Sequence, residues 1–218
     1  MYVASVIKGE SKMSGFTYEF ETKRTELETY EWDNVWWEQT GRRDTPRVLY
    51  IGDSISCGIR RIATERSEGE LLFDGFGTSK ALDNPFFFDS IRTFAKQQGY
   101  RRAVIFNNGL HGWHLDDEEQ YPFYYERAAQ FLLEEFKDTT VAIILTTSVA
   151  NAEREKRVIK RNATARKIAD KYGLPVIDLY SASVEHSDLR RDDGVHYTSA
   201  GYALLADKIL EDLRAIAL

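Results

Sequence analysis

Cysteine is almost absent from this chain of 218 residues, since Cys57 is the only one. A single cysteine cannot form an internal disulfide, so a disulfide framework is excluded and a reducing compartment fits. The chain also has no run of about 18 apolar residues, and its start lacks the basic segment and long apolar stretch of a signal peptide. We therefore expect a cytoplasmic protein with no membrane partner.

Excess positive charge is missing as well. The formal net charge is -6, whereas a protein that binds nucleic acid needs clustered lysine and arginine to neutralise phosphates. Residues 153–167 are locally basic, but their apolar spacing is typical of an amphipathic helix with a solvated charged face. With 43% hydrophobic and 29% charged residues, the composition indicates a folded globular protein that has no nucleic-acid partner.

Strand-like and helix-like segments alternate from residue 46 to residue 218, which we treat as one domain. Apolar strands separated by helices predict an α/β fold with a mainly parallel sheet covered on both faces. Such sheets bind their ligands at the carboxyl ends of the strands. We expect strands at 47–52, 70–75, 103–109, 140–147 and 175–180, and helices at 56–65, 86–98, 123–136 and 199–216, with another ending near Lys171.

The first 45 residues differ from the rest and are interpreted as an N-terminal arm packed on the main domain. Residues 16–32 alternate apolar and charged side chains, a pattern compatible with one or two strands. Three tryptophans, Trp32, Trp36 and Trp37, lie within six residues of one another. Large aromatic side chains usually pack a segment onto its domain, but an indole can also line a substrate pocket. Both interpretations stay open.

A serine stands at the carboxyl end of the first strand of the main domain. Gly52, Asp53 and Ser54 join this strand to the helix that follows. At the electropositive start of a helix, Ser54 can attack a carbonyl while its own backbone N–H stabilises the oxyanion. The alternative is that Asp53 or Ser54 only caps the helix, as these residue types commonly do.

An aspartate and a histidine occur together near the other end of the chain. Asp193 precedes His196 by three residues, in a loop that leads into the last helix. A hydroxyl nucleophile needs a base, and the base needs an acidic partner on its other ring nitrogen. At this spacing Asp193 can reach the imidazole of His196, whereas the spacing of Asp192 fits less well.

The two motifs together strongly resemble those of the SGNH (GDSL) hydrolase superfamily. "YIGDSIS" follows the start of the main domain and "DGVHYTSAGY" lies close to its end, and the resemblance covers residues 47–218. It implies a flavodoxin-like three-layer α/β/α fold and hydrolysis of an ester through an acyl-serine intermediate, with no cofactor. By this resemblance Ser54 is the nucleophile, His196 the base and Asp193 the orienting acid.

Members of this superfamily complete the oxyanion hole with a glycine after the second strand and an asparagine after the third. Gly77 is the candidate for the glycine and Gly75 is the alternative. At the position of the asparagine this chain has His111, whose neutral imidazole can donate one N–H. Asn107 and Asn108 are alternative donors, but both precede the glycine of the segment.

The segment "NNGLHGWH", residues 107–114, also raises a metal site as an alternative. His111 and His114, with Asp116 or Asp117, supply ligand types but no recognised ligand spacing, and an oxyanion hole needs no metal. We therefore expect no metal. His114 is expected to make a structural hydrogen bond or to line the pocket beside Trp113.

The expected function is that of a serine esterase which removes small acyl groups, such as acetyl, from carbohydrate. The partner is then a small-molecule or oligosaccharide ester, and the oligomeric state stays open. A lipase, lysophospholipase or thioesterase of the same superfamily is one alternative, and a non-catalytic carbohydrate-binding protein is the other. The residues expected to contact the substrate are Asp53, Trp36, Trp37, Trp113 and His114.

Overall fold

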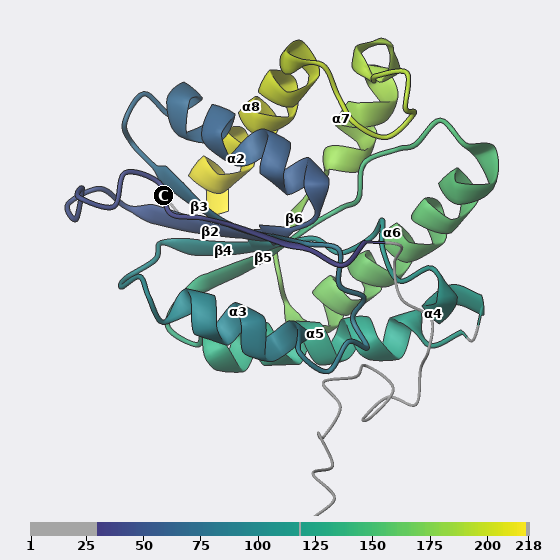
Figure 1. The fold of residues 1–218 in the computed structure, drawn as a ribbon, viewed down its shortest axis with the longest axis horizontal. Coiled ribbons are helices and arrows are strands. Elements are labelled where there is room, and N and C mark those ends of the chain that lie inside the picture. Colours follow the sequence, from purple (N-terminus) through teal and green to yellow (C-terminus); the bar gives the residue numbers. More distant parts are fainter. Residues whose placement is uncertain (1–29, 118, 217–218) are drawn as a thin grey trace, which may run out of the picture.

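The computed structural model describes residues 30–117 and 119–216. A six-stranded sheet runs through its centre in the order β1-β3-β2-β4-β5-β6 (Figure 1). Strands β2 to β6 are parallel to one another, whereas the edge strand β1 is antiparallel to β3. The strands are β1 (Asp33–Trp36), β2 (Arg47–Gly52), β3 (Leu72–Thr78), β4 (Ala103–Phe106), β5 (Thr140–Ile144) and β6 (Val176–Ile177).

Helices cover both faces of this sheet. In Figure 1, α2, α7 and α8 lie above the sheet, while α3, α5 and α6 lie below it. This three-layer arrangement confirms the predicted fold class. The helices are α2 (Ser54–Arg66), α3 (Phe87–Ala95), α4 (His114–Asp117), α5 (Tyr121–Glu135), α6 (Ala152–Tyr172), α7 (Leu179–Glu185) and α8 (Ser199–Ile216), with a short 3-10 helix at Ser187–Leu189. Among the described residues, no helix combines the length and the apolar character needed to cross a bilayer.

The central strands are apolar on both sides because each side faces a helix layer. In β2, Leu49 and Ile51 join the core formed with α3, α5 and α6, while Val48 and Tyr50 join the core formed with α2 and α8. Successive side chains of a strand point to opposite faces, so a strand buried between two layers must be apolar throughout. This is the pattern from which the parallel sheet was predicted.

Strand β1 lies at the edge of the sheet, where Asp33 pairs with Thr78 and Trp36 pairs with Gly75. The strands expected within 16–32 fall mainly on residues 1–29, which lie outside the described residues, and residues 30–32 are not strand. The described edge strand was missed because its side chains are mostly exposed and give little apolar alternation.

The bounds of four strands differ from those expected, and two of these strands, β4 and β5, end three residues early, at Phe106 and Ile144. Strand β3 begins at Leu72 and continues to Thr78, so Gly77 lies within it rather than after it. Strand β6 ends at Ile177 and is followed by α7, where a strand had been expected up to residue 180. The physical reason is a cap: the Asp178 carboxylate accepts a hydrogen bond from the backbone N–H of Ser181 at 3.0 Å, which starts a helix.

Candidate active site

Ser54 lies where the centre of the sheet meets a helix. Strand β2 runs between β3 and β4, and its carboxyl end leads directly into Ser54, the first residue of α2. The Asp53 carboxylate accepts a hydrogen bond from the backbone N–H of Ile55 at 2.9 Å and so caps the helix. Asp53 is therefore the residue that caps α2, as the alternative interpretation of this segment proposed. The Ser54 hydroxyl is not used for capping.

His196 connects Ser54 to Asp193. Its Nε2 lies 2.8 Å from the Ser54 hydroxyl oxygen, and its Nδ1 lies 2.9 Å from an Asp193 carboxylate oxygen. With the proton on Nδ1, the imidazole donates to the carboxylate and leaves Nε2 free to accept the serine proton. The structure thus brings the three residues together in the order expected, and Asp193 rather than Asp192 is the partner of His196.

Asp193 is held by its own loop. Its other carboxylate oxygen accepts hydrogen bonds from the backbone N–H groups of Val195 and His196, both at 2.8 Å. These two N–H groups, followed by the His196 side chain, lower the pKa of Asp193 to about 2. The carboxylate is therefore charged at neutral pH and can stabilise an imidazolium.

The loop that contains Asp193 and His196 is anchored to the segment after β5. The backbone N–H of Ala150 donates to the Gly194 carbonyl at 2.8 Å, and the Tyr197 hydroxyl donates to the Ser148 carbonyl at 3.1 Å. Gly194 has a φ of +75°, a left-handed conformation that strains other residues. These contacts hold the histidine loop above the carboxyl end of the sheet.

Gly77, the candidate oxyanion glycine, pairs with Gly52 across β2 and β3, beside Ser54. A Cβ atom at Gly77 would lie 2.3 Å from the Cys57 sulfur, so no side chain fits there. At Gly75, the alternative, a Cβ atom would collide with Arg60 at 2.3 Å. The close packing around Gly77 therefore leaves no room for a side chain at this position. The role of the Gly77 backbone N–H as an oxyanion donor stays a prediction.

His111, the candidate donor in place of the asparagine, is half-buried. Its ring lies edge-on to that of Trp32, with 6.1 Å between ring centroids. Burial raises the pKa of Asp53, and the strongest opposing influence is the neighbouring imidazole of His111. His111 is therefore close to the residue that precedes the nucleophile.

The two alternative donors have other partners. The Asn107 amide donates to the Ile144 carbonyl at 3.0 Å and to the Thr146 hydroxyl at 2.9 Å. The Asn108 amide donates to the Lys80 carbonyl at 3.2 Å. Both amide groups thus donate to acceptors within the protein, so His111 stays the preferred oxyanion donor.

Three of the residues expected to contact substrate have structural partners instead. Asp53 is 1% exposed and caps α2. The Trp36 ring lies under the Arg61 guanidinium, 5.0 Å from its centroid, and its indole N–H donates to Glu38 at 2.8 Å. The Trp37 ring packs on Phe94 of α3 with 4.4 Å between centroids. For these tryptophans the structure favours the packing interpretation, because their rings cover α2 and α3.

The side chains of Trp113 and His114 also contact other residues of the protein. Arg157 and Arg161 lie over the Trp113 ring at 5.1 and 4.3 Å. Nε2 of His114 lies 3.1 Å from both carboxylate oxygens of Asp83, which is the structural hydrogen bond expected for it. Among the described residues, no group of three histidine, cysteine, aspartate or glutamate side chains is arranged to hold a metal ion.

Sequence reasoning missed two residues near this site. Trp32, whose ring contacts His111, was noticed only as one of three neighbouring tryptophans. Arg161 was not singled out: it belongs to the basic segment 153–167, for which a solvated charged face was expected, yet it is only 1% exposed. Its charge was misleading, because Arg161 follows the buried Val158 by three positions and precedes the buried Ala165 by four, which is the spacing of the buried face of the helix.

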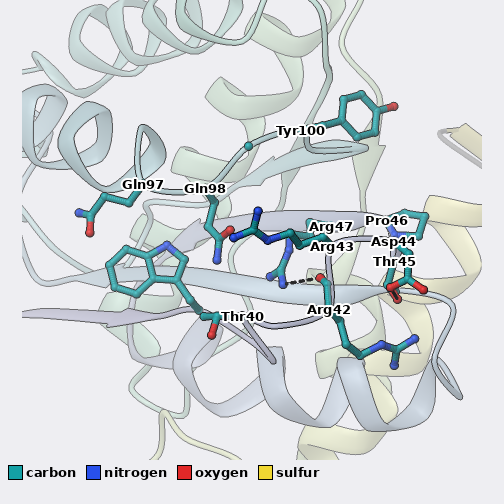
Figure 2. Close-up of a pocket in the computed structure, with 12 residues that line it drawn as sticks. Thr40, Arg42, Arg43, Asp44, Thr45, Pro46, Arg47, Gln97, Gln98 and Tyr100 are labelled. Atoms are coloured by element: carbon teal, nitrogen blue, oxygen red, sulfur yellow. Dashed lines mark hydrogen bonds between the residues drawn. The ribbon is translucent and has the colours of Figure 1, made fainter.

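A separate large cavity lies at the opposite end of the central strands from Ser54 (Figure 2). Its volume is about 750 Å³, and Figure 2 shows Arg42, Arg43 and Arg47 beside Gln97 and Gln98. The first three come before or at the start of β2, and the glutamines precede β4. The cavity therefore lies at the amino ends of these strands, whereas Ser54 follows a carboxyl end.

Comparisons with known proteins agree with this geometry. The family model of the GDSL-like lipase/acylhydrolases matches residues 116–209, a range that includes Asp193 and His196. The resemblance to the SGNH (GDSL) hydrolases is confirmed. The search of curated proteins gave no significant match.

Several solved structures share the fold. A crystal structure of the acetyl xylan esterase AlAXEase superposes with a TM-score of 0.58 and 20% identity, covering 76% of this chain and 98% of that one. The catalytic domain of Streptococcus pneumoniae peptidoglycan O-acetyltransferase A gives 0.62 and 18%, covering 79% and 94%. The lipase/acylhydrolase from Enterococcus faecalis gives 0.61 and 17%, covering 78% and 96%. At these identities the likeness establishes the fold, and with the family model it supports an acylhydrolase.

Proposed function

We propose that this protein is a serine esterase that removes O-acetyl groups from carbohydrate. The observation that carries the proposal is the unbroken chain from the Ser54 hydroxyl through His196 to Asp193, with contacts of 2.8 and 2.9 Å. A nucleophile, a base and an orienting acid within hydrogen-bond distance are what acyl transfer to serine requires.

The reaction has two halves. In the first, the Ser54 oxygen attacks the ester carbonyl while Nε2 of His196 takes its proton, and Asp193 stabilises the imidazolium. The backbone N–H groups of Ser54 and Gly77 and the imidazole of His111 would hold the oxyanion. The alcohol leaves with the proton from His196. In the second half, His196 deprotonates a water that attacks the acyl-serine, which releases the carboxylic acid and restores the Ser54 hydroxyl.

A tryptophan beside the proposed oxyanion donor supports carbohydrate as the substrate. Trp32 contacts His111, so an indole stands next to the place where the carbonyl would bind, and sugar rings pack well on such faces. Two of the structural neighbours are named as acting on acetylated polysaccharide or peptidoglycan, an acetyl xylan esterase and a peptidoglycan O-acetyltransferase. We further propose that the enzyme acts in the cytoplasm on imported oligosaccharides.

The test compares Ser54→Ala with wild type on p-nitrophenyl acetate and on acetylated xylo-oligosaccharides. We expect turnover to fall by about 10³-fold or more, because the nucleophile is lost. Ser56→Ala is the matched control, since the Ser56 hydroxyl donates to the Asp53 carbonyl at 2.7 Å rather than to His196. Equal hydrolysis by Ser54→Ala and wild type would reject the proposed nucleophile.

A series of acyl chain lengths separates the esterase from its enzymatic alternative. We expect kcat/KM to fall steadily from acetyl to decanoyl esters. A maximum at long chains would instead indicate a lipase, lysophospholipase or thioesterase. A wild-type protein that neither hydrolyses any of these esters nor reacts with a fluorophosphonate at Ser54 would favour the non-catalytic carbohydrate-binding alternative.

A further inference from the structure

Arg161 of helix α6 binds the backbone of the segment that contains His111. Its Nη1 donates to the carbonyls of Gly109 and His111 at 3.2 and 2.6 Å, and its Nη2 donates to the Gly112 carbonyl at 2.8 Å. The arginine is only 1% exposed, so these hydrogen bonds form away from water. One buried guanidinium therefore binds three backbone carbonyls in the four-residue span 109–112, which includes His111, the proposed oxyanion donor.

The buried charge of Arg161 is compensated locally. Its Nε donates to the Asp116 carboxylate at 3.0 Å, and its guanidinium carbon lies over the rings of Trp113 and Tyr121, at 4.3 and 4.2 Å from their centroids. A planar cation with five donors can make all of these contacts at once. Lysine, with a single charged nitrogen, could reach only some of them.

A second arginine extends the same arrangement by one helical turn. Arg157 also donates to the Asp116 carboxylate, at 2.8 Å, and to the carbonyl of Trp113. The backbone around His111 is thus oriented by α6, although more than forty residues separate the two segments. Because each peptide unit is planar, holding three carbonyls in this short segment fixes the orientation of their peptide planes and restricts the directions open to the Cα–Cβ bond of His111.

We propose that Arg161 is a positioning residue: it holds the backbone around His111 so that the imidazole is directed at the oxyanion. This inference rests on the proposed esterase function. Oxyanion stabilisation depends on donors that are already in place when negative charge develops, so a donor on a loosened loop loses most of its effect. Arg161 acts through His111 and contacts no reacting atom itself.

The first test is Arg161→Lys, which keeps the charge but not the three carbonyl contacts. With p-nitrophenyl acetate we expect kcat to fall by about 10-fold or more and KM to change by less than about 3-fold, because the lost interaction belongs to the transition state. Arg166→Gln is the matched control on the same helix: its exposed side chain pairs with Asp178, and its kcat should equal that of wild type. An unchanged kcat in Arg161→Lys would overturn the proposal.

A double-mutant cycle shows whether Arg161 acts through His111. In a His111→Ala background, Arg161→Lys should lower kcat by less than about 2-fold, because the donor that it positions is already gone. Equal losses in both backgrounds would show that Arg161 acts independently of His111 and would overturn the inference. Should Arg161→Lys fail to fold, Asp116→Asn provides the same cycle, since it removes the carboxylate partner and keeps the arginine.

Nuclear magnetic resonance gives a readout that needs no catalysis. The chain has four histidines, whose ring Cε1–H signals can be assigned by substitution. In Arg161→Lys we expect the His111 signal to shift or broaden while the His196 signal stays at its wild-type position. An unmoved His111 signal would contradict the positioning role even if the wild-type protein turned out to hydrolyse no ester, an outcome that would reject the proposed function separately.

Discussion

Asp193 keeps its charge at a partly exposed position. Its side chain is 48% exposed, yet two backbone N–H groups and His196 bind its carboxylate. A carboxylate that accepts several hydrogen bonds is favoured over its protonated form, and the pKa of Asp193 is accordingly lowered to about 2. This shift has a direct consequence for stability as a function of pH.

The free energy of unfolding should depend on pH through Asp193. The pKa is about 2 in the folded chain and about 3.9 in an unfolded one, so the unfolded chain binds the proton first. The stabilisation is therefore fully present above about pH 5 and is lost as the pH falls from about 4 towards 2. Urea unfolding should show a gap between wild type and Asp193→Asn that is largest above pH 5.

The control for this experiment is Asp192→Asn. Asp192 is an exposed neighbour in the same loop, and above pH 5 we expect Asp192→Asn to differ less from wild type than Asp193→Asn does. Solvent screening keeps the Asp193 effect below that of a buried pair. A gap that stayed constant from pH 2 to pH 6 would contradict the hydrogen-bonded carboxylate.

Residues of one loop were predictable from sequence, whereas residues of different loops were less so. Asp193 and His196 are three positions apart, and a turn of that length brings carboxylate and imidazole together by itself. Trp36 and Trp37 were placed in the pocket on residue type alone, but they pack on α2 and α3. Trp32 contacts His111 from 79 positions away, a relation that no local pattern contains.

At the scale of elements, a buried ion pair connects two strands with the segment after β1. Arg47 of β2 donates to Asp74 of β3 at 2.7 Å, and the two side chains are 6% and 0% exposed. The same guanidinium donates to the carbonyls of Glu38, Gln39 and Arg42. Arg47 therefore satisfies backbone groups that the edge segment would otherwise leave without a partner.

Removing Arg47 should be strongly destabilising. In Arg47→Met, Asp74 is left buried without its cation, and we expect the free energy of unfolding to fall by about 3–5 kcal/mol. The double variant Arg47→Met/Asp74→Leu should recover part of this loss, because the buried carboxylate that loses its partner in the single variant is then absent. Urea unfolding followed by tryptophan fluorescence measures all of these values.

The matched control is Arg66→Met, which breaks an exposed pair with Asp207 whose side chains are 45% and 48% exposed. Its loss should be only about 0–1 kcal/mol, since exposed ion pairs contribute little. A loss below about 1 kcal/mol for Arg47→Met as well would mean that Asp74 is not held as a charged partner of Arg47.

Helices and central strands were predicted well because their patterns are local. The last helix has the bounds expected for it, Ser199–Ile216, and β2 matches residues 47–52. The last strand was expected at residues 175–180, but β6 covers only Val176–Ile177, and the helix α7 that follows it was missed. Edge strand β1 was missed as well: it is a strand because it pairs with β3, and its own side chains show no strand pattern.

At the scale of the whole molecule, two cores share one sheet. Ile105 points to the core of α2 and α8, while the next residue, Phe106, points to the core of α3, α5 and α6. Both side chains are fully buried. Because the same strand contributes to both cores, losing one should weaken the other.

We expect one cooperative unfolding transition for both cores. Ile105→Ala should lower the free energy of unfolding by about 2–5 kcal/mol and Phe106→Ala by about 3–5 kcal/mol, each through a cavity. Urea curves recorded by far-ultraviolet circular dichroism and by tryptophan fluorescence should coincide in both variants. Curves that separate would show that the two cores unfold independently.

Val35→Ala serves as the control for these core variants. Val35 is 44% exposed on β1, so its truncation should change the free energy of unfolding by no more than about 0.5 kcal/mol. A larger effect would mean that the edge strand carries more of the stability than its exposure indicates.

The sequence by itself determined what local patterns encode. Apolar runs specified the parallel sheet, Ser54 was placed at the carboxyl end of β2, and Asp193 and His196 were placed in one loop. The tertiary structure alone decided which distant residues meet: Arg161 against the backbone at His111, and Trp32 against its ring. The physical reason is that periodicity reports the conformation of a segment and the face that it buries, whereas a hydrogen bond between segments depends on how the helices and the sheet pack.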